Sequence, residues 1–166
     1  MKSLNQLLKM LKLKFMKEFN SIDEILLFAI EQEQKAVDFY TGLAKEAHSE
    51  EMKRVFLEFA GEEIRHKKRL TDIRDRGIFT MPVEKVADLK IADYTIEVKA
   101  SGKLSYEEAL VLAMKREKAA FRLYSNLAER APDKDLKDIF ESLAMEESRH
   151  KLRFELEYDE YVLREN

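Results

Sequence analysis

The sequence predicts an all-α protein, a four-helix bundle made of two repeated helical hairpins joined by a long crossover. Residues 21–75 align without a gap on residues 105–159 at an offset of 84 positions, and 20 of the 55 pairs are identical. Within each repeat, apolar residues recur at the spacing of one helix face, and a break divides the repeat into two helical segments. A turn between neighbouring helices needs only a few residues, so residues 77–104 are too many for one.

Residues 1–20 precede the first repeat and form a basic, amphipathic extension. Apolar residues between Leu4 and Phe15 lie at helical spacing, but lysines interrupt them, so the segment lacks the continuous apolar core of a signal peptide. Three interpretations stay open. The extension is a helix on a membrane surface, a helix that docks loosely or packs in an oligomer, or a largely adventitious stretch before a translation start at Met16.

The first repeat is expected to form a hairpin of two helices. Ser21 and Glu24 make a capping box, in which the serine hydroxyl and the glutamate carboxylate each accept a hydrogen bond from a free backbone N–H at the helix start. The break at residues 47–49 ends this helix, and Ser49 is expected to cap the next one. Gly77 is expected to end the second helix, because glycine readily adopts the left-handed conformation common at helix C-termini.

The crossover, residues 77–104, contains Pro82 and Gly102 and shows no helical stripe of useful length. About 27 extended residues reach roughly 90 Å, whereas a helix of about 26 residues is roughly 39 Å long. The segment can therefore travel the full length of a bundle.

The second repeat follows the same plan as the first. Ser105 and Glu108 form the second capping box. The break at residues 131–133 includes a proline, which disfavours continuation of the preceding helix. The fourth helix is expected to run from Lys134 to about Tyr158 or beyond.

Length and composition restrict the class of protein. A chain of 166 residues suits a single bundle domain over residues 21–166. The net charge of −3 gives no reason to expect nucleic-acid binding, and no stretch is apolar for long enough to span a membrane. The chain has no cysteine, which excludes disulfides, thiol catalysis and iron–sulfur ligation. We expect a cytoplasmic protein, and the many charged residues suggest a thermophile.

Two glutamates in each hairpin are expected to lie at the same height. Glu33 lies 15 residues before His48 in the break, and Glu63 lies 15 residues after it. Antiparallel packing therefore places these carboxylates at nearly the same level. His66 follows Glu63 by three residues, so the two side chains project from one helix face. The second repeat supplies the equivalent residues Glu117, Glu147 and His150.

Together these six residues predict a site for two metal ions. These carboxylates lie on helix faces that are otherwise apolar, and a buried carboxylate is costly unless its charge is neutralised. Four carboxylates carry a charge of −4, which two divalent ions balance when both imidazoles are neutral. Carboxylates with imidazoles suit iron or manganese, whereas a structural zinc site would more often use cysteine. Glu62 and Glu146 recur as alternative ligands, while His48 has no equivalent and is expected to be a surface turn residue.

These motifs resemble the ferritin-like di-iron carboxylate proteins, especially rubrerythrins and their relatives. The resemblance covers residues 21 to about 159 and rests on two Glu-x-x-His motifs and two glutamates each followed seven residues later by a tyrosine. It implies that Glu63 and Glu147 bridge two iron ions, with one terminal glutamate and one histidine for each ion. It also implies that the tyrosines orient the carboxylates. The terminal glutamates are Glu33 and Glu117, the histidines His66 and His150, and the tyrosines Tyr40 and Tyr124.

The resemblance further implies a di-iron oxidoreductase that reduces hydrogen peroxide or dioxygen. Rubrerythrins usually carry a rubredoxin domain with four cysteines, so this cysteine-free chain is expected to use an external, rubredoxin-like electron donor. Ala120 stands where rubrerythrins typically have a further glutamate, and the site is therefore expected to be symmetric. A ferroxidase or iron-handling protein, and a structural bundle with adventitious metal, are the alternatives. Manganese or zinc could substitute for iron, and a homodimer is expected, with hairpins able to exchange between chains.

Overall fold

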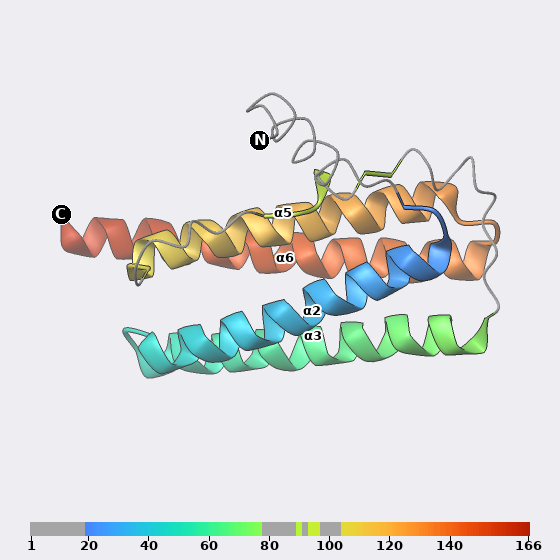
Figure 1. Cartoon of the computed structure of the whole chain (residues 1–166). Coiled ribbons are helices and arrows are strands. Elements are labelled where there is room, and N and C mark those ends of the chain that lie inside the picture. The colour runs from blue at the N-terminus through green and yellow to red at the C-terminus, as the bar shows by residue number, and fades with distance from the viewer. Residues whose placement is uncertain (1–18, 78–88, 91–92, 97–103) are drawn as a thin grey trace, which may run out of the picture.

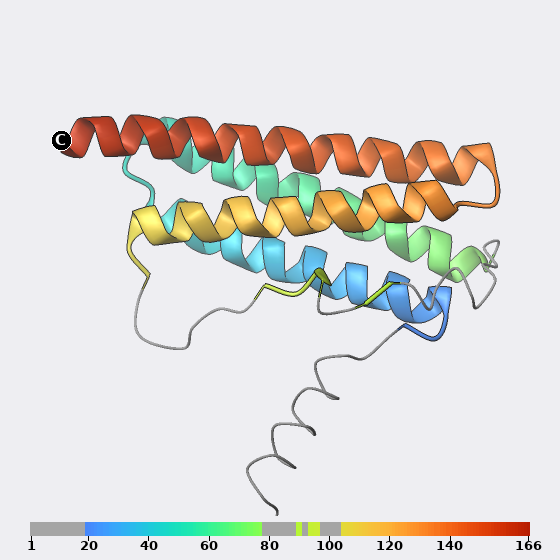
Figure 2. The same cartoon turned by 90° about the horizontal axis from the view of Figure 1, so that it is seen from above.

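The computed structural model describes residues 19–77, 89–90, 93–96 and 104–166, and long helices make up most of this part (Figure 1). They are α2 (Ile22–Glu46), α3 (Glu50–Arg76), α5 (Tyr106–Arg130) and α6 (Lys134–Glu165). α2 packs along α3, and α5 packs along α6, as two antiparallel hairpins that lie side by side (Figures 1 and 2). The predicted all-α four-helix bundle of two hairpins is confirmed. The extension at residues 1–18 and most of the crossover lie outside the described residues.

Most helix boundaries fall at the residues that the sequence indicates. The Ser49 hydroxyl and the Asp133 carboxylate each accept a hydrogen bond from the backbone N–H three residues later, at 3.1 and 2.9 Å. Gly77 ends α3 with φ +58°, a conformation that glycine adopts at little cost. His48 lies exposed in the turn between α2 and α3, as expected.

The capping box predicted for the first repeat is wrong in one of its two bonds. Ser21 Oγ accepts from the backbone N–H of Glu24 at 3.2 Å, but the Glu24 carboxylate accepts from the backbone N–H of Asn20, at 2.9 Å. Ser105 and Glu108 form both bonds, at 3.1 and 2.9 Å. The backbone explains the difference, because φ is −153° at Ser21 and −68° at Ser105, which turns the two N–H groups in different directions.

The described parts of the crossover lie along α2 and α5. α3 ends and α5 begins at opposite ends of the bundle, so the crossover must span its length (Figure 2). Leu89 and Tyr94 are buried, and the Tyr94 hydroxyl accepts a hydrogen bond from the Asn126 amide at 2.8 Å. None of the described helices is long and apolar enough to cross a membrane.

Two apolar clusters fill the bundle interior, one toward each end. The first includes Ala29 and Leu70, and the second includes Tyr40 and Ala60. Along each of α2 and α3, the chain passes from one cluster to the other, and α5 and α6 do the same. The mid-height of the bundle lies between the clusters, and the polar site is there.

Candidate metal centre

Six acidic and histidine side chains meet at mid-height, buried among the four helices. Each is at most 3% exposed. The helical periodicity that places apolar residues on the core-facing side of each helix also places these six polar residues on that side. The structure brings together all six residues singled out in the sequence: Glu33 on α2, Glu63 and His66 on α3, Glu117 on α5, and Glu147 and His150 on α6.

Glu63 and Glu147 lie at the centre of the group, and each reaches both histidines. The Glu63 oxygens lie 3.1 Å from His66 Nδ1 and 2.9 Å from His150 Nδ1. The Glu147 oxygens lie 2.9 and 3.6 Å from the same two nitrogens. The other two carboxylates are one-sided: Glu33 lies 3.9 Å from His66 Nδ1, and Glu117 lies 3.6 Å from His150 Nδ1.

These contacts divide into two overlapping groups of four side chains, each able to hold one ion. In each group the ligand atoms lie within 4.8 Å of one another, and Glu63 and Glu147 belong to both groups. Three carboxylates and one imidazole per group are donors that iron and manganese accept well. The first group adds Glu33 and His66 to the shared pair, and the second adds Glu117 and His150.

The donor atoms face a common space. Glu63 Oε1 lies at ion-pair distance from His150 Nδ1, 2.9 Å, yet neither atom has a well-aligned hydrogen bond among the described residues, and the same holds for Glu117 Oε2 and Glu147 Oε1. Buried polar atoms without partners are rare because each costs free energy. Donor atoms that converge in this way with few well-aligned hydrogen bonds fit the coordination of cations at that point.

Two glutamates outside the centre hold the far nitrogens of the histidines. Glu146 Oε2 lies 2.6 Å from His66 Nε2, and Glu62 Oε2 lies 2.6 Å from His150 Nε2. Each contact crosses from one hairpin to the other. When Nε2 carries the proton and donates it to the carboxylate, the Nδ1 lone pair is left free for an ion and the ring is held in place.

The structure thus gives Glu62 and Glu146 a role different from the alternative considered in the sequence. They lie on the outer side of the imidazoles, away from the converging donor atoms. Arginines contact them in turn: Arg149 lies 3.1 Å from Glu62, and Arg69 lies 3.2 Å from Glu146. Their recurrence at the 84-residue offset, beside the predicted ligands, was the signal available in the sequence.

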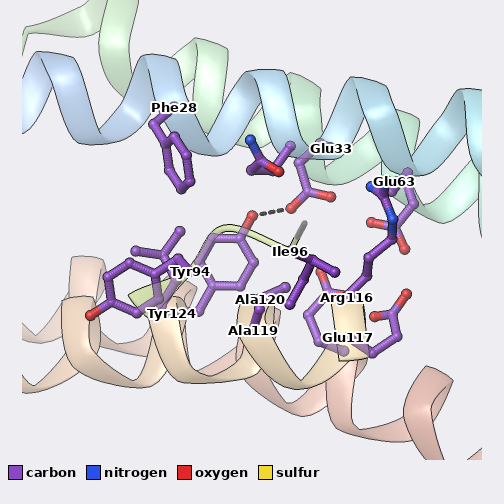
Figure 3. A pocket seen from close by; sticks show the side chains of 14 residues that line it. Phe28, Glu33, Glu63, Tyr94, Ile96, Arg116, Glu117, Ala119, Ala120 and Tyr124 are labelled. Carbon is purple, nitrogen blue, oxygen red and sulfur yellow. Dashed lines mark hydrogen bonds between the residues drawn. The ribbon is translucent and has the colours of Figure 1, made fainter. Parts of the chain in front are cut away.

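The two tyrosines differ in their contacts. The Tyr124 hydroxyl donates a hydrogen bond to the Glu33 carboxylate (Figure 3). The Tyr40 hydroxyl is buried and has no hydrogen-bond partner among the described residues. The orienting contact implied by the resemblance is therefore present in one half of the centre and absent from the other.

Protons are distributed unequally over the four carboxylates. Burial, followed by the charges of Glu147 and Glu63, raises the pKa of Glu33 well above its usual range, and burial and Glu147 do the same for Glu117. Burial also acts on Glu147, but contacts with Glu117 and both histidines outweigh it and lower its pKa. The pKa of Glu63 is lowered as well, because its contacts with the histidines outweigh burial and the charge of Glu147.

The histidines hold protons strongly when no metal is bound. Burial lowers the pKa of His66, but the Glu147 and Glu63 carboxylates outweigh it and raise the pKa to about 10. Burial likewise opposes protonation of His150, and the surrounding carboxylates raise its pKa further. Two imidazolium charges then balance the two ionised central carboxylates, so protons neutralise the centre as two divalent ions would.

The fold and this centre define a ferritin-like four-helix bundle with a buried carboxylate–histidine site. A solved structure from Thermotoga maritima, provisionally described as that of a ferritin-like diiron-carboxylate protein, aligns with a TM-score of 0.67 and 22% identity, over 87% of this chain and 99% of its own. No curated protein matches the sequence. The sequence model of the Rubrerythrin family matches residues 24–158. The chain therefore belongs to the rubrerythrin family.

Proposed function

We propose that the protein is a di-iron oxidoreductase that reduces hydrogen peroxide with electrons from an external donor. The observation that carries the proposal is that Glu63 and Glu147 each reach both histidines, as carboxylates that bridge two ions would. Family membership supports iron as the metal and peroxide or dioxygen as the oxidant. The chain has no cysteine, so a separate protein of the rubredoxin type is the proposed electron donor.

The residues of the centre support this chemistry in three ways. Two iron ions, when bound, supply the two electrons that reduce one peroxide to water. The four carboxylates neutralise the ions, while Glu62 and Glu146 keep the imidazole lone pairs turned inward. Phe59 stacks on the His150 ring with 4.2 Å between ring centroids and helps to exclude water from the ligands.

The ligand assignment is tested by metal analysis of variants. Glu63→Ala or Glu147→Ala removes a carboxylate that serves both ions, so each variant should lose at least one of the two ions per chain. Glu58→Ala is the matched control, because Glu58 lies on α3 but is exposed. Undiminished metal in both Glu63→Ala and Glu147→Ala would contradict the assignment.

The activity is tested by anaerobic reduction followed by rapid mixing with stoichiometric peroxide or with oxygenated buffer. Peroxide should produce the ferric absorption faster than dioxygen, and turnover should stop after one cycle unless reduced rubredoxin is added. If dioxygen reacts faster and iron accumulates well beyond two ions per chain, the protein is instead a ferroxidase that serves iron handling.

We further propose a homodimer, in which hairpins can exchange between chains because each hairpin supplies half of the centre and the long crossover joins the halves. Chains carrying Glu63→Ala and chains carrying Glu147→Ala provide the test. Refolded together, an exchanged dimer regenerates one centre with both carboxylates intact, and metal content should recover in part. Mixed chains that bind no more metal than each variant alone would contradict exchange.

A further inference from the structure

A small cavity opens beside the carboxylates between α2 and α5 (Figure 3). Its volume is about 40 Å³, and all four glutamates of the centre line it. Because one water needs roughly 10–15 Å³ on such a measure, the space suits a molecule of two or three heavy atoms. Three alanines among its lining residues keep this face open: Ala36, Ala119 and Ala120.

Two polar residues that occupy equivalent positions in the repeats also line the cavity. Gln32 precedes Glu33, Arg116 precedes Glu117, and the two are 84 positions apart. The repeat therefore places a neutral amide on one side of the cavity and a guanidinium on the other. In Figure 3, Arg116 reaches from α5 toward the α2 side, beside the carboxylates.

Arg116 has no counter-ion within the described part of the chain. Its Nε is buried without a hydrogen-bond partner, and its guanidinium rests on the Phe39 ring, with Cζ 5.1 Å from the centroid. A partly buried cation without an anionic partner is costly, and the cost falls when an anion binds beside it.

We propose that the cavity is a binding site for a small monovalent anion, held by the Arg116 guanidinium and the Gln32 amide beside the metal centre. With two divalent ions bound, the four carboxylates balance the ions, and Arg116 leaves one uncompensated positive charge at the cavity. In the diferric state the ions carry two further positive charges, and Arg116 adds to this excess. Linear or diatomic anions such as azide or deprotonated peroxide have the size and charge that the site accepts. The inference rests on the proposed function, since the anion occupies the approach to the ions.

Azide is the probe, and the diferric protein gives the readout because azide bound at iron adds a charge-transfer absorption. Arg116→Gln copies the residue at the equivalent position of the first repeat and removes the charge. We expect it to weaken azide binding by about ten- to a hundredfold, the range for a hydrogen bond to a charged group. Arg116→Lys should retain part of the affinity. Lys115→Gln removes a neighbouring exposed charge on α5 and should bind azide as the parent protein does.

Nitric oxide bound to the diferrous protein is the neutral comparison. Arg116→Gln should bind it with unchanged affinity, whereas Ala120→Leu, which fills the cavity, should weaken both ligands while keeping two ions per chain. Equal azide affinity in Arg116→Gln and the parent protein would overturn the inference, as would azide that fails to bind a parent protein holding two irons. Azide binding that depends on Arg116, in a protein that peroxide does not oxidise, would support the anion site and reject the proposed function.

Discussion

Metal binding is expected to displace protons from the centre, and the structure indicates how many. Without metal, raised pKa values favour a proton on each of four groups: His66, His150, Glu33 and Glu117. Ions require ionised carboxylates and free imidazole nitrogens. Binding two divalent ions should therefore release up to four protons, two from imidazolium groups and two from carboxyl groups.

The affinity for metal should consequently depend steeply on pH. Each proton exchanged contributes about 1.4 kcal/mol per pH unit. The two imidazolium protons alone therefore weaken the combined binding of two ions by about 2.7 kcal/mol when the pH falls from about 7 to about 6, and each carboxyl proton released adds about 1.4 kcal/mol. The sign follows from the direction of the shifts. A raised pKa keeps the proton on the metal-free protein, so acid competes with the ions and binding tightens as the pH rises.

Calorimetric titration with Mn²⁺ in two buffers of different ionisation enthalpy counts these protons. Glu33→Gln removes one of the four protonated groups and should release one proton fewer. Glu31→Gln is the matched control, because Glu31 lies two residues away on α2 and is exposed. If the parent protein releases fewer than two protons, or if Glu33→Gln releases as many as the parent protein, the inference that protons occupy the metal-free centre would be refuted.

Three further predictions concern residues around the centre and at one end of the bundle. Glu62→Gln weakens the carboxylate contact that orients an imidazole, and equilibrium dialysis should show about a 10- to 100-fold loss of metal affinity. Tyr124→Phe leaves its buried carboxylate partner without a donor and should destabilise the fold by about 1 to 3 kcal/mol in urea unfolding, whereas Tyr40→Phe should be near neutral. Burial raises the pKa of Glu157, so the folded protein loses stability when the pH rises and this carboxyl group ionises. Glu157→Gln removes the ionisation but can still accept a hydrogen bond from the Tyr106 hydroxyl. The variant should therefore raise the melting temperature at neutral pH more than near pH 4.

The sequence was sufficient to place the six residues of the centre at one level, because helix rise is constant and the breaks mark where each hairpin turns. Glu33 and Glu63 meet because each is equally far from the turn between α2 and α3. The helix starts at Ser49 and Ser105 were equally predictable, since capping is a local interaction. The partner of Glu24 was not, because it depends on the backbone angle at the preceding cap rather than on residue type.

Contacts between side chains of the two hairpins could not be predicted from the sequence. Glu62 lies four residues before His66 on the same helix, so spacing makes it an alternative ligand for the nearer histidine. The structure pairs it instead with His150 at 2.6 Å, a contact that depends on how α3 faces α6. Helix spacing gives height and approximate direction, whereas the choice between the inner and outer side of a ring follows from tertiary packing.

The internal repeat predicts the features that its two halves share, whereas the reactivity of the centre depends on residues that differ between the halves. Shared residues supply the symmetric parts, the four carboxylates and two histidines. Tyr124 donates to a carboxylate, whereas its equivalent Tyr40 donates to none of the described residues. Arg116 and its equivalent Gln32 line the same cavity, but only Arg116 carries a charge. Each difference places a donor or a charge on one side only. Two ions in matching ligand sets would therefore sit in unequal fields, and the side that carries Arg116 is the one at which an anion should bind.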